Sequence, residues 1–230
     1  MNKAKFVTVV LMALLLLPAR AAFAAEDLAS VLAKLDTAAA RFHTTTADFE
    51  FKNVQTQPLP DEDTQTGTVD YERKGSAFQM GVHIDKVNGK PVPKVYVYSG
   101  GVFKLYEKLI NQVTTLTKLS GYESWFMLGF GASGRDLSAK WQIKYLGTEK
   151  IDGVDTAKLE LIPKDPAVLK YIQKATLWMD TERGISLQQR FDEGPDGYRT
   201  CHYFNIKLNQ PLPNDAFTLH TDKNTTTVTR

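Results

Sequence analysis

Residues 97–106 read VYSGGVFKLY, two runs of β-branched and aromatic residues on either side of a Ser-Gly-Gly turn. Such runs favour β-strands, and glycines are typical of the turn between two paired strands. Both runs are apolar at consecutive positions, whereas a strand with one solvated face would alternate apolar and polar residues. This stretch therefore predicts a β-hairpin that meets apolar material on both faces.

Similar strands recur about every ten residues on both sides of this hairpin. Turn signals such as Asn88-Gly89, Asp152-Gly153 and Asp196-Gly197 separate them. This spacing predicts one large antiparallel sheet rather than a series of βαβ units. The expected strands cover residues 49–54, 67–73, 78–84, 94–98, 102–106, 112–117, 140–146, 155–162, 175–180, 185–191 and 199–208.

Three segments predict helices. Residues 26–43 place apolar side chains three and four apart, which is typical of an amphipathic helix. Residues 119–130 would form a short helix with apolar side chains around nearly its whole circumference. Asp165-Pro166 is typical of the start of a further short helix. A sheet with two apolar faces but few helices can curve around a cavity or fill a closed core with its aromatic rings. Composition alone favours the closed core.

The N-terminus has the features of a cleavable signal peptide. Lys3 and Lys5 precede an apolar run from Phe6 to Leu17, and residues 22–24 read AFA. The run is shorter than the roughly 20 apolar residues of a membrane-spanning helix, which disfavours a retained anchor. We therefore expect cleavage after Ala24, one folded domain over residues 25–220 and a flexible tail over residues 221–230.

Charge and composition exclude several classes of protein. The formal net charge is +2 and falls close to zero once the basic residues of the signal peptide are removed, so no nucleic-acid partner is expected. The single cysteine, Cys201, rules out an internal disulfide and is expected to be buried.

No sequence motif for catalysis or metal binding is present, so we expect no enzyme activity, cofactor or metal. The four histidines are scattered, and the sequence around Ser133 only superficially resembles a nucleophile turn. Asp192, Glu193 and Asp196 are interpreted as solvated turn carboxylates rather than as a calcium site.

Taken in order, six segments resemble LolA, the periplasmic carrier of outer-membrane lipoproteins. The resemblance runs from about residue 28 to residue 217, and each segment is weak alone. It implies an α+β fold, an unclosed antiparallel β-barrel with a helical lid over a hydrophobic cavity that takes acyl chains. The segments are residues 35–51, 67–73, 97–106, 126–128, 161–164 and 209–217.

The resemblance also implies a site. Arg73 matches the family's lid-latching arginine, although Lys74 follows it where the family has proline; the alternative is a surface arginine at a strand end. We expect its acceptors among the carbonyls of residues 121–130. The expected cavity and lid residues are Phe78, Met80, Tyr96, Tyr98, Phe103, Trp125, Phe126, Leu128, Trp178 and Phe191.

The function implied is that of a monomeric periplasmic carrier. It would bind acylated lipoproteins or other lipids, receive them from an inner-membrane releasing complex and deliver them to an outer-membrane acceptor. The alternative is a lipid- or lipoprotein-sensing module of an envelope-stress or glycolipid-transport system, because the same fold serves several functions.

Overall fold

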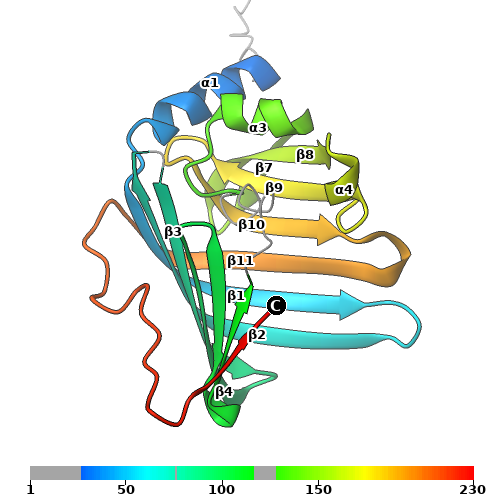
Figure 1. Cartoon of the computed structure of the whole chain (residues 1–230). Coiled ribbons are helices and arrows are strands. Elements are labelled where there is room, and N and C mark those ends of the chain that lie inside the picture. Colours follow the sequence, from blue (N-terminus) through cyan, green and yellow to red (C-terminus); the bar gives the residue numbers. More distant parts are fainter. Residues whose placement is uncertain (1–26, 76, 117–127) are drawn as a thin grey trace, which may run out of the picture.

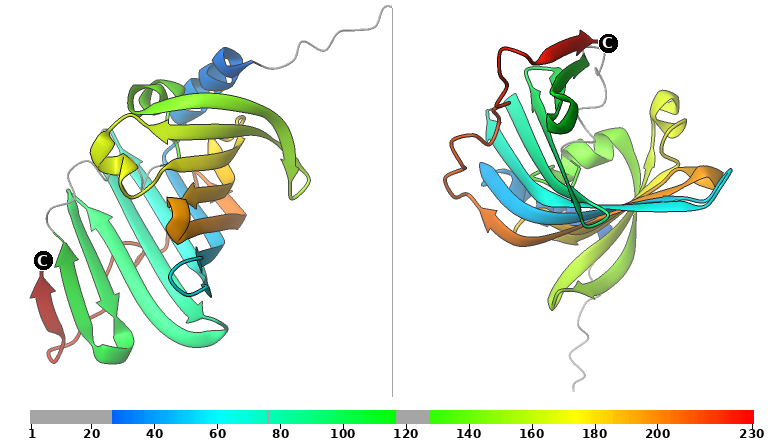
Figure 2. Two further views of the ribbon diagram at one scale, coloured as in Figure 1. Left: turned by 90° about the vertical axis from the view of Figure 1, so that its right-hand side faces the viewer. Right: turned by 90° about the horizontal axis from the view of Figure 1, so that it is seen from below.

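The computed structural model describes residues 27–75, 77–116 and 128–230. Its twelve strands form a single sheet in the order β12-β6-β5-β4-β3-β2-β1-β11-β10-β9-β8-β7. All neighbouring strands are antiparallel except β12 and β6. The sheet is strongly curved and does not close on itself (Figures 1 and 2). The predicted unclosed antiparallel sheet is confirmed.

The strand bounds extend the sequence-based ranges by a few residues. The strands are β1 (Thr44–Gln55), β2 (Asp61–Lys74), β3 (Ala77–Val87), β4 (Lys90–Ser99), β5 (Val102–Glu107), β6 (Gln112–Leu116), β7 (Trp141–Ile151), β8 (Val154–Pro163), β9 (Lys174–Asp180), β10 (Ile185–Asp192), β11 (Gly197–Leu208) and β12 (Thr226–Thr229). Two 3-10 turns, η1 (Lys108–Ile110) and η2 (Gly194–Asp196), connect strands.

Helix α1 (Leu28–Ala39) is shorter than the predicted helix over residues 26–43. It begins after Asp27, whose Oδ1 accepts a hydrogen bond from the Ser30 N–H at 2.8 Å. The β-branched residues that begin β1 at Thr44 favour strand geometry and follow only a short turn after the helix ends. The predicted cap at Asp165 is confirmed, since Asp165 Oδ1 accepts from the Ala167 N–H at the start of α4 (Pro166–Leu169).

Helix α3 (Gly134–Lys140) was not predicted. Ser133 is its N-cap, and Ser133 Oγ accepts a hydrogen bond from the Asp136 N–H at 3.0 Å. Capping of this helix accounts for Ser133 without a catalytic role. Helices α1 and α3 lie together over β7–β9 at one end of the sheet (Figure 1). No helix within the described ranges is long and apolar enough to cross a membrane.

The segment predicted to be a loose tail contains β12. Its four residues pair with Gln112–Thr115 of β6 in a parallel register. Threonine favours strand geometry, and β6 would otherwise present unpaired backbone groups at the sheet edge. The threonine-rich composition that was taken to indicate a tail is also a composition that favours a strand.

The sheet packs two clusters of buried side chains. One lies under α1 and α3 and is mostly aliphatic, with Leu35, Leu159, Leu161 and Leu177 fully buried. The other lies over β1–β4, β10 and β11 and is rich in aromatic rings, including Phe49, Tyr71, Phe78, Tyr98, Phe130 and Tyr203. The aliphatic cluster closes one part of the concave face, and the aromatic cluster surrounds a cavity.

Candidate functional site

The cavity lies on the concave face between β1–β4 and β10–β11 and has a volume of about 340 Å³. Most of the side chains that surround it are apolar or aromatic. Sites for small molecules are typically concave, mostly apolar and supplied with a few polar groups. The lining residues are Phe49, Phe51, Gln65, Val69, Tyr71, Met80, Val82, Ile84, Tyr96, Leu128, Gln189, Phe191, Cys201 and Tyr203.

Strand alternation and register place these side chains together. Phe49 and Phe51 are two residues apart on β1, so both project from the same face. Across the β1–β11 pair they stand opposite Tyr203 and Cys201. Gly67 stands opposite Phe49 on β2, where a Cβ atom would overlap the His83 carbonyl oxygen. Glycine therefore permits the close approach of β2 and β3 at the bulge beside the cavity.

The polar groups in the wall are neutral. Burial raises the pKa of the Cys201 thiol to about 12 and raises the pKa of the Tyr71 and Tyr203 hydroxyls above the usual value for tyrosine. The Tyr203 hydroxyl donates to Gln189 Oε1 at 3.4 Å. An uncharged wall of this kind favours an apolar ligand with at most neutral polar groups.

A short segment, residues 128–131, borders the cavity and is held by hydrogen bonds to β10 and its preceding turn. The Ser186 N–H donates to the Gly129 carbonyl at 2.6 Å, and the Gly131 N–H donates to the Gly184 carbonyl at 3.1 Å. Gln189 Nε2 donates to the Leu128 carbonyl at 2.6 Å. These bonds fix the segment beside the opening of the sheet.

Arg73 makes a further bond to this segment. Its Nη2 donates to the Gly131 carbonyl at 2.7 Å, and its guanidinium lies 5.6 Å from the centroid of the Phe42 ring. Partial burial lowers the pKa of Arg73, an effect that the Asp136 carboxylate opposes. The acceptor lies one residue beyond the range 121–130 in which the sequence analysis expected it.

Nine of the ten predicted cavity and lid residues divide into three groups. Met80, Tyr96, Leu128 and Phe191 line the cavity. Phe78, Tyr98 and Phe103 lie beside it in the aromatic cluster, where Phe78 stacks on Tyr71 with ring centroids 5.6 Å apart. Trp125 and Phe126 lie outside the described residues, as does most of the predicted lid helix.

Trp178 is placed on the opposite face of the sheet. Its strand neighbours Leu177 and Met179 belong to the aliphatic cluster, so Trp178 projects away from it. Lys158 Nζ lies 4.8 Å from the centroid of its ring. The run Ala175–Met179 is apolar at nearly every position, which left its inward and outward side chains indistinguishable in the sequence.

Several lining residues were not predicted, notably Phe49, Phe51, Tyr71, Gln189 and Tyr203. The period-two spacing of Phe49 and Phe51 was a usable signal. Gln189 gave no such signal, because its burial, at 3% exposed, is known only from the structure.

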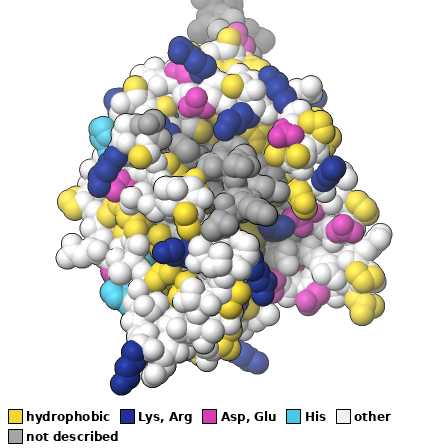
Figure 3. All heavy atoms as spheres, viewed as in Figure 1, with side chains coloured by type: hydrophobic (Ala, Val, Ile, Leu, Met, Phe, Trp, Pro, Cys, Tyr) yellow, Lys and Arg dark blue, Asp and Glu magenta, His cyan; other side chains and the backbone are white. Residues whose placement is uncertain are grey.

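No group of three His, Cys, Asp or Glu side chains that could hold a metal ion occurs within residues 27–75, 77–116 and 128–230. The acidic turn residues form ion pairs instead: Asp192 with Arg190, and Glu193 with Arg199. Over the described part of the face shown in Figure 3, acidic and basic side chains are interspersed.

Comparison with known proteins gives a fold but little sequence similarity. No family model matches the chain. A stretch of 121 residues is 27% identical to the uncharacterized protein MJ0687 of Methanocaldococcus jannaschii. The matched stretch covers 53% of this chain and only about a third of the length of that relative.

The chain resembles several solved structures in its fold. An uncharacterized conserved protein from Thermus thermophilus matches 88% of this chain and 98% of its own at a TM-score of 0.56 and 11% identity. MucB, also solved as the Pseudomonas aeruginosa MucA/MucB complex, matches 83% of this chain and 62% of its own at a TM-score of 0.52 and 11% identity.

A LolA superfamily protein from Nitrosomonas europaea covers 85% of this chain and 99% of its own, at a TM-score of 0.38 and 17% identity. Identities this low bear on the fold alone. The open, curved sheet with its flanking helices is the fold that the chain shares with the Thermus thermophilus protein and with MucB.

Proposed function

We propose that the chain is a periplasmic carrier that binds the acyl chains of lipoproteins in the concave cavity and ferries them toward the outer membrane. The observation that carries this proposal is the cavity itself: an apolar, uncharged hollow of about 340 Å³ on the open part of a LolA-like sheet. Small-molecule sites have volumes on the order of 300–1,000 Å³, so the hollow is large enough for part of an acyl chain.

A carrier must release what it binds. Burial of an acyl chain contributes about 0.8 kcal/mol per CH₂ group. The bonds from Arg73 to Gly131 and from Gln189 to Leu128 hold residues 128–131 beside the cavity. If a ligand must break these bonds on entry, part of the apolar gain is offset and transfer to an acceptor stays feasible.

The remaining elements of the proposal follow from the resemblance to LolA. Residues 1–24 act as a cleaved signal peptide, the working protein is a monomer, and its partners are a releasing complex at the inner membrane and an acceptor at the outer membrane. It needs no cofactor and carries out no reaction.

A binding experiment tests the cavity. Tyr96→Asp places a charge in the cavity wall and should reduce the affinity for a fluorescent long-chain fatty acid at least about tenfold, because a carboxylate is costly in an apolar site. Phe204→Asp is the control, since Phe204 is 38% exposed and projects away from the inward-facing Tyr203. Equal affinities for the two folded variants would rule out the cavity as the lipid site.

The second candidate is a sensing module that binds a lipid or lipoprotein and reports it to a protein partner. The likeness to MucB, solved in complex with MucA, favours it, although the chain spans less than two thirds of MucB. Transfer of bound lipoprotein to acceptor vesicles separates the two, because a carrier delivers its ligand and a sensor retains it.

A further inference from the structure

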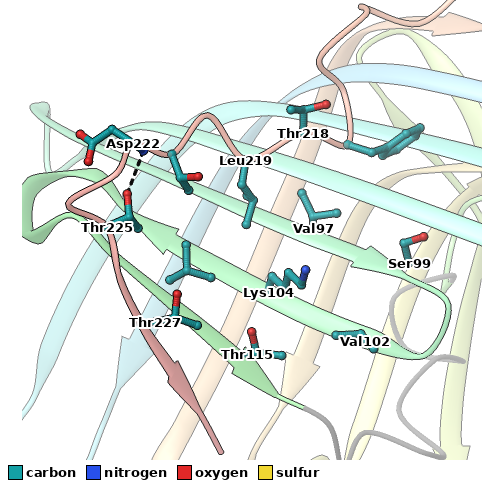
Figure 4. A pocket seen from close by; sticks show the side chains of 13 residues that line it. Val97, Ser99, Val102, Lys104, Thr115, Thr218, Leu219, Asp222, Thr225 and Thr227 are labelled. Atoms are coloured by element: carbon teal, nitrogen blue, oxygen red, sulfur yellow. Dashed lines mark hydrogen bonds between the residues drawn. The ribbon is translucent and has the colours of Figure 1, made fainter.

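A second hollow, of about 800 Å³, lies on the convex face of the sheet beneath the C-terminal segment (Figure 4). Its floor is formed by outward side chains of β4, β5, β6 and β12, and residues 217–225 arch over it. Val97, Ser99 and Lys104 of the floor alternate with Tyr96, Tyr98 and Phe103, which face the concave side. The sheet therefore separates this hollow from the inner cavity.

The segment that spans the hollow, residues 217–225, is called the arch, and Ala216 anchors its N-terminal end. Ala216 is 2% exposed and packs on Gly81, where a Cβ atom would overlap the Ala216 carbonyl oxygen. His83 Nε2 lies 3.3 Å from the same oxygen. Gly81 thus provides the space in which the C-terminal segment meets β3.

The C-terminal end of the arch is anchored by Asn111, which follows η1. Asn111 Nδ2 donates to Asp222 Oδ1 at 3.2 Å, and the Thr225 hydroxyl donates to Asn111 Oδ1 at 2.8 Å. Between the two ends, the backbone bonds of Thr218 and Thr221 are local, to the carbonyls of Asp215 and Leu219. The segment is therefore anchored on both sides of a hollow that it spans.

The lining combines one cation with hydroxyl and aliphatic groups. Lys104 is exposed in the floor between Val97 and Thr115, and has no carboxylate partner among the ion pairs of the described residues. Ser99 and Thr227 add hydroxyl groups that can donate to an anion. The apolar part of the lining consists of Val97, Val102, Val113, Phe217 and Leu219.

We propose that this hollow binds an anionic amphiphile, with the carboxylate or phosphate head at Lys104 and the alkyl chain against the valines and Leu219. The one acidic side chain among the described residues of the lining, Asp222, is held at the far end by Asn111 and by the Asn224 N–H. The site lies outside the inner cavity and does not depend on the carrier function.

Protection of an introduced thiol tests this site. Native Cys201 is buried, with a pKa raised to about 12, so a Ser99→Cys variant gives one accessible thiol within the hollow. We expect saturating decanoate or decyl phosphate to slow maleimide labelling of that thiol at least about tenfold, while decanol does not. A ligand in the inner cavity cannot give this result, because Ser99 faces the other side of the sheet. The two anions distinguish a carboxylate ligand from a phosphate ligand.

Two further variants define the contacts. Lys104→Met in the Ser99→Cys background should abolish protection by the anions, and Gly81→Ala should weaken it by displacing the arch at Ala216. Lys144→Cys, on exposed β7, is the labelling control and should show no protection. The proposal is overturned if neither anion protects the thiol introduced by Ser99→Cys, if decanol protects equally, or if Lys104→Met retains full protection.

Discussion

The concave face of the sheet is closed at one end and open at the other. Over β7–β9, helices α1 and α3 cover an aliphatic cluster that includes Val31, Leu35, Leu159 and Leu177. Over β1–β4, no described helix covers the face, and aromatic rings with a few neutral polar groups surround a cavity. The end over β7–β9 is therefore packed and contributes mainly to stability, whereas the end over β1–β4 contains the cavity that can hold a ligand. Two predictions test this division, and a third concerns the opposite face of the sheet.

The largest effect is expected from a truncation in the packed end. Leu159 is fully buried, so Leu159→Ala should lower the free energy of unfolding by about 2–5 kcal/mol. Met80 is 5% exposed but lines the cavity, where fewer atoms contact it, so Met80→Ala should cost less than half as much. Urea unfolding measures both. Equal losses would mean that the two ends are packed alike.

A smaller effect is expected at the boundary between the two ends. Arg73→Leu removes the bond to the Gly131 carbonyl and should increase the rate of lipid uptake about tenfold, the factor for about 1.4 kcal/mol. Delivery to acceptor vesicles should slow, because no bond re-forms when the lipid leaves. Stopped-flow uptake and vesicle transfer measure the two steps.

Arg41→Leu is the matched control for Arg73, since Arg41 is exposed just after α1 and should change neither rate. If Arg73→Leu also leaves uptake and transfer unchanged, the arginine stabilises residues 128–131 without affecting the ligand.

The smallest effect concerns the convex face beneath the C-terminal segment. Burial raises the pKa of the Asp70 carboxyl above 3.8, opposed by the Thr46 hydroxyl and by His83, and Asp215 adds to the increase. A raised folded-state pKa means that the contribution to stability is present below the unfolded-state pKa and is lost as pH rises through the folded-state value.

Asp70→Asn keeps an acceptor for the Thr46 hydroxyl and should therefore modestly increase stability at pH 7. The difference from the native chain should shrink as the pH approaches 3.8. Asp61→Asn at the exposed start of β2 is the control. An Asp70→Asn variant with no gain at pH 7 would show that burial does not raise the pKa of Asp70 in solution.

Much of the fold was predictable because turn signals and strand runs are local. The hairpin of residues 97–106 and the turns at Asn88 and Asp152 fall where the sequence predicted them. Helix α3 was missed because its seven residues, Gly134–Lys140, are too few for a clear apolar stripe. Serine is a typical N-cap residue, but Ser133 was compared only with a nucleophile turn.

The site was less predictable because a cavity wall depends on which way each side chain projects. Met80 was placed by the resemblance to LolA and Tyr96 by an apolar run, and both line the cavity. The apolar run of Trp178 misplaced that residue, since a strand that is apolar on both faces gives no alternation. Arg73 was predicted to bind carbonyls of residues 121–130 only through the resemblance to LolA, and its acceptor is the Gly131 carbonyl. Gln189, which bonds the Leu128 carbonyl, was not predicted. Sequence spacing contains no information about such pairs.

The strand order has a consequence for how the chain reaches this structure. Strands β1–β6 and β7–β11 are two runs of sequential neighbours, and within the sheet they meet at the pairing of β1 with β11, where Thr45 stands opposite Leu208. Each run can form from short-range contacts, whereas their junction must close a long loop of chain at an entropic cost. We therefore expect the β1–β11 junction to form last and to limit the folding rate. In pulsed hydrogen exchange, the amides of this junction should gain protection after those within either run, and simultaneous protection would contradict this order.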